Sequence, residues 1–322
     1  MRADLPSLLP LICPACRHVS ARGRELYTLS VVQVLRATGG DDDGSPEDIE
    51  EGTLRCDNPA CARRYPILHG IPVLLTDLTR FAATQLHALS CFHEPETLAM
   101  MALDGPDDSA LPRMLDYLSI YLDAHFGDYA MPPPDGPEPG CGGTPLWQAV
   151  EARKLVPVDR AIELGCGVGR GLHALSQTAE LTVGVEMNFA ALLYARWLLR
   201  GETVRYARRT SGRHYSAATV HVPAVSTTSV QLVCGDALDP PLAPDSFSRE
   251  YWSSLEYHEV QLVVSDWKSS RIFLALNELL PTMLRCLIFA ALPSVILMLT
   301  CTRLRSRLTT EVLTETLYLP RL

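Results

Sequence analysis

Four cysteines near the start of the chain have a spacing that could bind a metal ion. Cys13 and Cys16 form a Cys-x-x-Cys pair, and Cys56 and Cys61 form a second pair with four residues between its members. Two such pairs let two turns of the backbone present four thiolates to one tetrahedral ion, the ligand set that Zn²⁺ prefers. We therefore predict a closed, structural zinc centre. A redox-active or disulfide-bonded pair is the alternative, but no thioredoxin-like βαβ pattern surrounds Cys13 and Cys16.

A glycine-rich segment in the second half of the chain could bind a nucleotide-like ligand. It reads Glu163-Leu-Gly-Cys-Gly-Val-Gly-Arg-Gly171, between a predicted strand over 160–164 and a predicted helix. Gly165, Gly167 and Gly169 would let the backbone turn tightly and approach a ligand at the start of that helix. Their spacing differs from the Gly-x-Gly-x-x-Gly of dinucleotide-binding enzymes, so an NAD-dependent oxidoreductase is a disfavoured alternative.

Two further acidic residues follow predicted strands. Glu186 ends the strand expected over 181–186, and Asp236, with Ala237, follows the strand expected over 230–234. Together with Glu163 they supply one acid at the end of each of three strands. Taken alone, Glu163 could cap its strand, and Asp236 could be a turn residue ahead of two prolines; both alternatives stay open.

The glycine loop and the three acids together resemble class I S-adenosylmethionine-dependent methyltransferases, with the type 11 group as the nearest likeness, over about residues 145–248. The resemblance implies that Glu163 positions the methionine end of the cofactor, that Glu186 holds both ribose hydroxyls, and that Asp236-Ala237 contacts the adenine amino group. A carboxylate suits the ribose because it accepts two hydrogen bonds. The implied activity is methyl transfer to an acceptor that the sequence does not identify, and no catalytic residue can be named.

The second cysteine pair lies in a stretch, Leu54 to Leu75, that contains Tyr65-Pro-Ile and Gly70-Ile-Pro. It resembles the small zinc-ribbon proteins that activate tRNA, rRNA and protein methyltransferases, over about residues 11–76. This resemblance implies a structural zinc and makes the ribbon a candidate surface for a protein partner. It also supports the alternative function, a catalytically inactive methyltransferase-like protein that acts as a binding module or activator.

Strands and helices alternate from 160 to 248, which is typical of a parallel sheet in an α/β fold. We predict a zinc ribbon over 11–76, a helical segment and Pro-rich linker over 77–144, an incomplete Rossmann-like domain over 145–248, and a divergent tail over 249–322. Leu111, Met114, Leu115, Leu118 and Leu122 recur at helical spacing within the second segment. No strand is expected after 248, where the resemblance stops; the tail is either divergent or frame-altered, or a genuine extension.

Composition limits the class of protein. The 322 residues are 47% hydrophobic and 20% charged, which excludes a disordered chain, and the net charge of −9 excludes an overall basic surface for nucleic acid.

Paired cysteines and the lack of a signal-peptide pattern predict a cytoplasmic protein. Residues 286–301 are the most apolar stretch, but as a helix they would measure only about 24 Å. A buried helix is therefore expected there, with a membrane span as the alternative.

Overall fold

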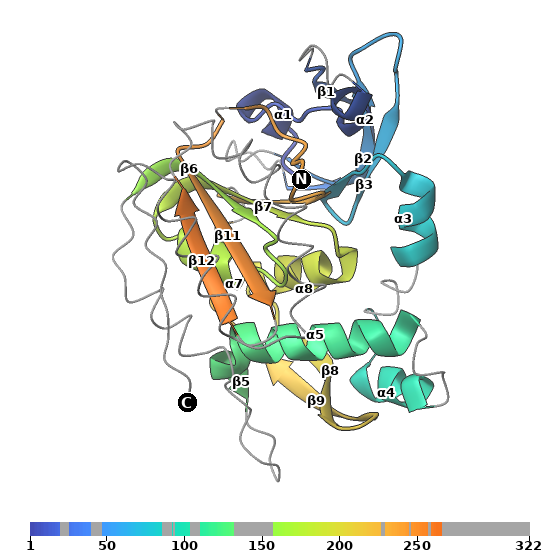
Figure 1. Cartoon of the computed structure of the whole chain (residues 1–322), viewed down its shortest axis with the longest axis vertical. Helices are drawn as coiled ribbons and strands as arrows, with labels where there is room; N and C mark the ends of the chain where they lie inside the picture. The colour runs from blue at the N-terminus through green and yellow to red at the C-terminus, as the bar shows by residue number, and fades with distance from the viewer. Residues whose placement is uncertain are drawn as a thin grey trace, which may run out of the picture.

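The computed structural model describes residues 1–19, 26–39, 47–85, 92, 94–103, 110–131, 157–226, 229–244, 246–256 and 259–265. In this part of the chain, nine strands form one mixed sheet in the order β1-β2-β3-β4-β10-β7-β6-β11-β12 (Figure 1). The strands are β1 (Leu29–Thr38), β2 (Asp48–Cys56), β3 (Arg64–Leu68), β4 (Ile71–Leu74), β6 (Val158–Leu164), β7 (Ala179–Glu186), β10 (Val230–Gly235), β11 (Arg249–Glu256) and β12 (Glu259–Ser265).

The centre of the sheet is parallel. Strands β4, β10, β7, β6 and β11 are paired in parallel, and helices α7 (Arg170–Leu175) and α8 (Phe189–Leu199) follow β6 and β7. All six residues of β10 are buried, as are the apolar residues Val183 and Val185 of β7. Continuous burial on both faces explains why these strands are apolar runs and do not alternate with polar residues. The predicted α/β class with a parallel core is confirmed.

The N-terminal ribbon continues this sheet. Strand β4 pairs in parallel with β10, with Val73 opposite Cys234 and Leu74 opposite Gly235. One core cluster contains ribbon residues such as Leu29 and Tyr65 together with Val233 of β10. The ribbon strands β1 to β3 lie at one end of the molecule, and short helices α1 (Leu5–Leu8) and α2 (Pro14–Val19) lie beside them (Figure 1).

The expectation that no strand follows position 248 is wrong. Strand β11 pairs in parallel with β6, with Arg249 opposite Ala161 and Trp252 opposite Leu164, and then pairs with β12 in an antiparallel hairpin. The physical reason is that β6 has an open edge: without β11 its outer backbone N–H and C=O groups would be unpaired.

Residues 266–322 lie outside the described residues, and so does the apolar stretch 286–301. No helix among the described residues is long and apolar enough to cross a membrane.

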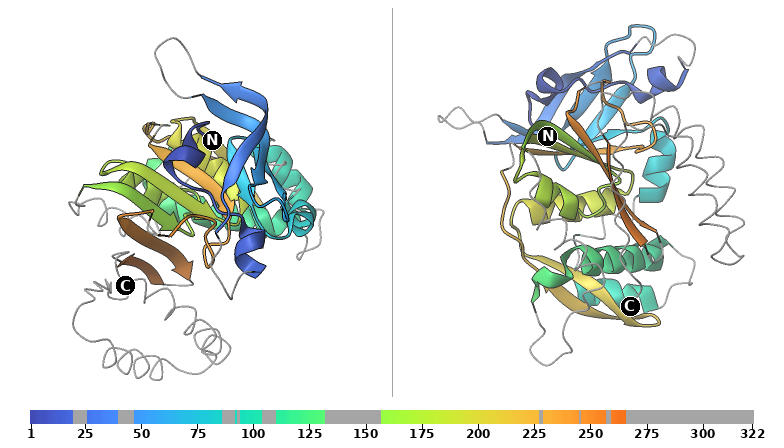
Figure 2. Two further views of the ribbon diagram at one scale, coloured as in Figure 1. Left: turned by 90° about the horizontal axis from the view of Figure 1, so that it is seen from above. Right: turned by 60° about the vertical axis from the view of Figure 1, so that its left-hand side comes forward.

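A second layer lies at the opposite end of the molecule from the ribbon strands (Figures 1 and 2). Its three-stranded sheet has the order β5-β9-β8. The elements of this layer are α4 (Pro95–Leu103), α5 (Ala110–Phe126), the 3₁₀ helix η2 (Gly127–Tyr129), β5 (Ala130–Met131), β8 (Val204–Ser211) and β9 (His214–Val220), and α3 (Leu78–Gln85) precedes them in the chain. The predicted helical periodicity is confirmed in α5, where Met114, Leu115, Leu118 and Leu122 are buried. The predicted Pro-rich linker beyond Met131 and the first residues of the predicted Rossmann-like domain, up to 156, lie outside the described residues.

Candidate functional site

The glycine loop joins β6 to α7 and adopts backbone conformations that other residues rarely adopt. Gly165, Gly167 and Gly169 have φ angles of +73°, +52° and +87°. The N–H groups of Gly165 and Cys166 donate to the Val185 carbonyl at 2.8 and 3.2 Å, so the loop is tied to β7. The loop therefore lies beside the carboxyl end of β7.

Gly171 is required for a different reason. Its φ is ordinary, but a methyl group at this position would lie 2.2 Å from Oε1 of Glu163. The Glu163 carboxylate therefore occupies the space beside the first turn of α7. Glu163 is only 1% exposed, so it has little freedom to move away.

The three predicted acids meet at one edge of the sheet because they end neighbouring parallel strands. Glu163 lies opposite Gly184 of β7, and Glu186 lies opposite Cys234 of β10, two residues before Asp236. The Glu186 carboxylate accepts hydrogen bonds from the N–H of Gly167 at 3.2 Å and of Asn188 at 2.8 Å. Asp236 accepts from the Leu238 N–H at 2.9 Å, and Ala237 is partly buried beside it. In open α/β sheets ligands bind at this edge, outside the carboxyl ends of the strands.

Two apolar residues at this edge were missed from the sequence. Met187 follows Glu186 and is 50% exposed, and Leu238 follows Ala237 and is 42% exposed. Large exposed apolar side chains beside two acids could pack against the faces of a flat ring, such as a nucleotide base. Their position in the chain, one residue after Glu186 and two residues after Asp236, was the only signal that could have identified them.

Helix α5 contributes two aromatic side chains to the candidate site that were not among the residues predicted from the sequence. Tyr117 and Tyr121 are stacked with ring centroids 4.1 Å apart. A methyl group at Gly167 would lie 3.4 Å from Cδ1 of Tyr121, so α5 covers the glycine loop. Burial, and then the charge of Glu186, raises the pKa of Tyr117, which keeps its phenol protonated.

An ion pair anchors the end of α5 to the glycine-loop helix. Arg170 is fully buried, and its two terminal nitrogens each lie 2.9 Å from an oxygen of Asp128. Its guanidinium also lies 4.6 Å from the centre of the Tyr129 ring. Next to it, burial and the Arg170 charge lower the pKa of His125 to about 3. This buried cluster fixes the position of α5 over the loop.

The four predicted metal ligands are brought together. The Sγ atoms of Cys13, Cys16, Cys56 and Cys61 all lie within 4.8 Å of one another. Two of these separations are 3.9 Å, from Cys13 to Cys61, and 3.7 Å, from Cys16 to Cys56. An ion about 2.3 Å from each of four tetrahedral sulfurs would separate neighbouring sulfurs by roughly 3.8 Å. Sulfur atoms this far apart are not disulfide-bonded, so the cluster is compatible with a structural zinc site.

Hydrogen-bond donors surround this cluster. The Tyr65 hydroxyl lies 3.2 Å from Cys13 Sγ, and the side-chain amide of Asn58 donates to Cys16 Sγ at 3.6 Å. The Asn58 N–H donates to Cys56 Sγ at 3.4 Å. Such outer contacts orient ligands and favour their charged form, as metal thiolates require.

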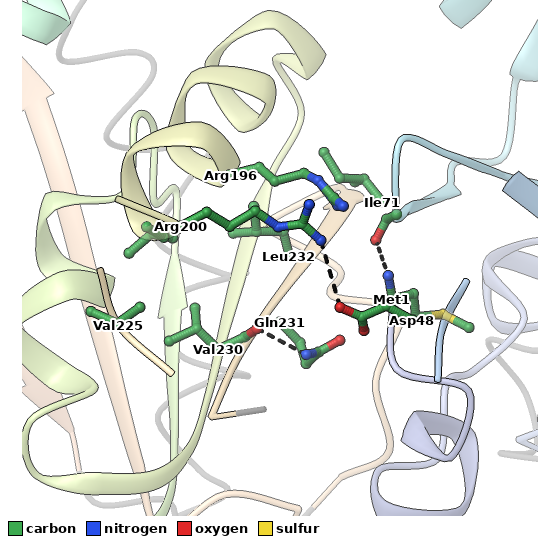
Figure 3. Close-up of a pocket in the computed structure, with 11 residues that line it drawn as sticks. Met1, Asp48, Ile71, Arg196, Arg200, Val225, Val230, Gln231 and Leu232 are labelled. Carbon is green, nitrogen blue, oxygen red and sulfur yellow. Dashed lines mark hydrogen bonds and ion pairs between the residues drawn. The ribbon is translucent and has the colours of Figure 1, made fainter. Parts of the chain in front are cut away.

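A small pocket lies where the ribbon meets α8 (Figure 3). Arg196 of α8 and Arg200, which follows the helix, extend toward Met1 and Asp48 there, and Arg200 is 3.5 Å from the Asp48 carboxylate. The cavity volume is about 40 Å³, enough for a few water molecules and too little for a nucleotide-sized ligand. This pocket is therefore part of the junction between the ribbon and α8.

Comparison with known proteins adds no family assignment. A scan of the sequence against protein-family models finds no match, and neither does a search of curated proteins.

Proposed function

We propose that this chain is an S-adenosylmethionine-dependent methyltransferase with a Rossmann-like class I fold and a structural zinc in its ribbon. One observation carries the proposal: Glu186 contacts the glycine loop through Gly167 and is paired with Cys234, two residues before Asp236. The strand order supports it. Numbered along the chain from β6, the parallel strands β10-β7-β6-β11 read 3-2-1-4, as in the doubly wound nucleotide-binding sheets.

The side chains at this edge have the chemistry to bind such a cofactor. Glu186 uses its two oxygens for backbone N–H groups, and a carboxylate has about four acceptor positions, so it can also accept from two ribose hydroxyls. Asp236 would accept from the adenine amino group, with Met187 and Leu238 against the ring. The buried Glu163 would attract the ammonium of the methionine end.

Bound at this edge, S-adenosylmethionine would supply an electrophilic methyl group, so the protein need only align an acceptor and exclude water. Tyr117 and Tyr121 of α5 would exclude water above the glycine loop. The proposal includes no general base, and the acceptor stays unassigned.

The test is a calorimetric titration of the zinc-loaded full chain with S-adenosylhomocysteine. We expect micromolar binding that weakens about 10- to 100-fold in Glu186→Gln and in Asp236→Asn, because each loses charge-assisted hydrogen bonds of roughly 1.5–3 kcal/mol. Glu180→Gln is the matched control, because Glu180 is exposed near the other end of the same strand. It should bind as the wild type does.

Other outcomes would point elsewhere. A folded, zinc-loaded chain that binds no S-adenosylhomocysteine would refute the proposal and favour a zinc-ribbon binding module without turnover. Tighter binding of NAD than of S-adenosylhomocysteine would favour an oxidoreductase. Equal losses in Glu186→Gln and Glu180→Gln would show that the effect does not come from the candidate site.

A further inference from the structure

Residues that flank the first cysteine pair of the ribbon contact the turn that follows Asp236. Arg17 follows Cys16 directly in α2, and its Nε lies 2.5 Å from Oδ1 of Asp239. Its Nη1 donates to the carbonyls of Pro240 at 2.9 Å and Leu242 at 3.0 Å. A single side chain beside a candidate metal ligand thus binds three groups of the turn, the Asp239 carboxylate and the carbonyls of Pro240 and Leu242.

Backbone hydrogen bonds also join the ribbon to this turn. The Ile12 N–H donates to the Pro241 carbonyl at 2.9 Å, and the Ala243 N–H donates to the Pro10 carbonyl at 3.1 Å. At its other end the turn leaves β10, whose Gly235 is paired with Leu74 of the ribbon. The ribbon therefore holds residues 236–243 from both ends.

The composition of the turn makes an outside donor important. Pro240 and Pro241 have no N–H and cannot donate hydrogen bonds, although their carbonyls still need partners. Ile12 supplies the partner of the Pro241 carbonyl from the ribbon. The Pro240 carbonyl accepts from Arg17 and also, within the turn, from the Leu242 N–H at 2.8 Å. The ion pair with Asp239 adds less, because the Asp239 side chain is 43% exposed and water screens it.

Hydrogen bonds within the turn connect residues 238 and 239 to Asp236, the candidate contact for adenine. The Asp239 N–H donates to the Asp236 carbonyl at 3.3 Å, and the Leu238 N–H donates to the Asp236 carboxylate at 2.9 Å. A shift of residues 239–242 would therefore move Asp236 and Leu238 together.

We propose that Arg17 is a positioning residue: the zinc-bound cysteine pair fixes Arg17, Arg17 fixes the turn 236–243, and the turn orients Asp236 for the cofactor. The inference rests on the proposed function for its last step. It makes cofactor affinity dependent on an intact metal centre in the same chain, through Arg17 and residues 239–242, to which the proposed function assigns no contact with metal or cofactor.

The experiment compares the zinc-loaded full chain with Arg17→Ala and Arg17→Lys. Arg63→Ala is the matched control, because Arg63 also lies in the ribbon and donates to a carbonyl, that of Thr76, away from this turn. Three quantities are measured: zinc content, amide hydrogen exchange of residues 236–243 without ligand, and affinity for S-adenosylhomocysteine.

For Arg17→Ala we expect retained zinc, roughly tenfold faster exchange in residues 236–243 and roughly tenfold weaker binding, a typical size for coupling between two sites. Arg17→Lys should give smaller changes, because lysine keeps the charge but has no planar fork to bind the Asp239 carboxylate through one nitrogen and the two carbonyls through another. Arg63→Ala should change none of the three.

Unchanged exchange at 236–243 in Arg17→Ala would overturn the proposal, as would weaker binding without faster exchange. Loss of zinc from Arg17→Ala would also overturn it, because Arg17 would then act on the metal centre and not on the turn. If the wild type binds no S-adenosylhomocysteine while the exchange result holds, the proposed function fails, and with it the step from the turn to the cofactor.

Discussion

His125 should make the protein less stable in mild acid. The side chain is 2% exposed on α5, and burial, reinforced by the Arg170 charge, lowers its pKa to about 3. The imidazole is therefore neutral in the folded chain throughout the range where an unfolded chain, with a pKa near 6.5, takes up a proton. Between pH 6.5 and pH 3 the unfolded state binds the extra proton, so stability falls as the pH falls through this window.

The size of the effect follows from the two pKa values. A pH of 5 lies about 1.5 units below the pKa of the histidine in the unfolded chain. Each unit is worth 1.36 kcal/mol, so protonation of the unfolded chain contributes about 2 kcal/mol in favour of unfolding. At pH 7.5 the same contribution is close to zero. His125→Phe removes the titration while keeping an aromatic ring beside Tyr121, whose centroid is 5.6 Å away.

The assay is urea denaturation of the zinc-loaded chain at pH 7.5 and pH 5. Between these values the wild type should lose about 2 kcal/mol more unfolding free energy than His125→Phe, whatever the variant costs at pH 7.5. His221→Phe, at an exposed position, is the matched control and should keep the wild-type pH dependence. Equal pH dependence in the wild type and His125→Phe would refute the reasoning.

Three further results are expected. Metal analysis should find one zinc per chain, which is lost in Cys56→Ser but kept in Cys234→Ala. Chelation of the zinc should lower the melting temperature, because the ribbon shares its core with β10. A metal-free chain with an unchanged melting temperature would contradict this prediction. Gly171→Ala should weaken S-adenosylhomocysteine binding and lower the unfolding free energy by about 1–3 kcal/mol, because the new methyl group must displace the Glu163 carboxylate. Wild-type affinity in this variant would show that binding does not require Glu163 at its present position. Asp128→Asn should lower the unfolding free energy in urea by about 3 kcal/mol, because it leaves the buried Arg170 charge without its partner; a loss below about 1 kcal/mol would exclude that ion pair as the anchor of α5.

Much of the candidate site was predictable because its signals are local. Cys13 and Cys16 are three residues apart, and the glycines from 165 to 171 need their residue type for backbone angles or space that a short segment decides. The strands ending at Leu164, Glu186 and Gly235 were visible as mainly apolar runs. Alternating strands and helices then imply a parallel sheet, in which such strand ends share one edge.

The contacts between distant segments were not predictable in this way. Strand β11 was missed because pairing with β6 uses backbone groups, which carry no residue signature and depend on which edge is open. The aromatic cover from α5 was hidden because Tyr117 and Tyr121 look like ordinary helix residues until Gly167 lies beneath them.

The sequence by itself therefore determined the chemistry available to this protein: four thiolates, a glycine loop and three strand-end acids. Only the tertiary structure decided how these parts are connected. It joined the ribbon to the parallel sheet through β4 and β10, and it placed Arg17 on the turn after Asp236, 223 residues away from Pro240 in the chain. The physical reason is that a motif depends on neighbouring residues, whereas such a junction depends on backbone edges and burial that exist only once the chain has folded.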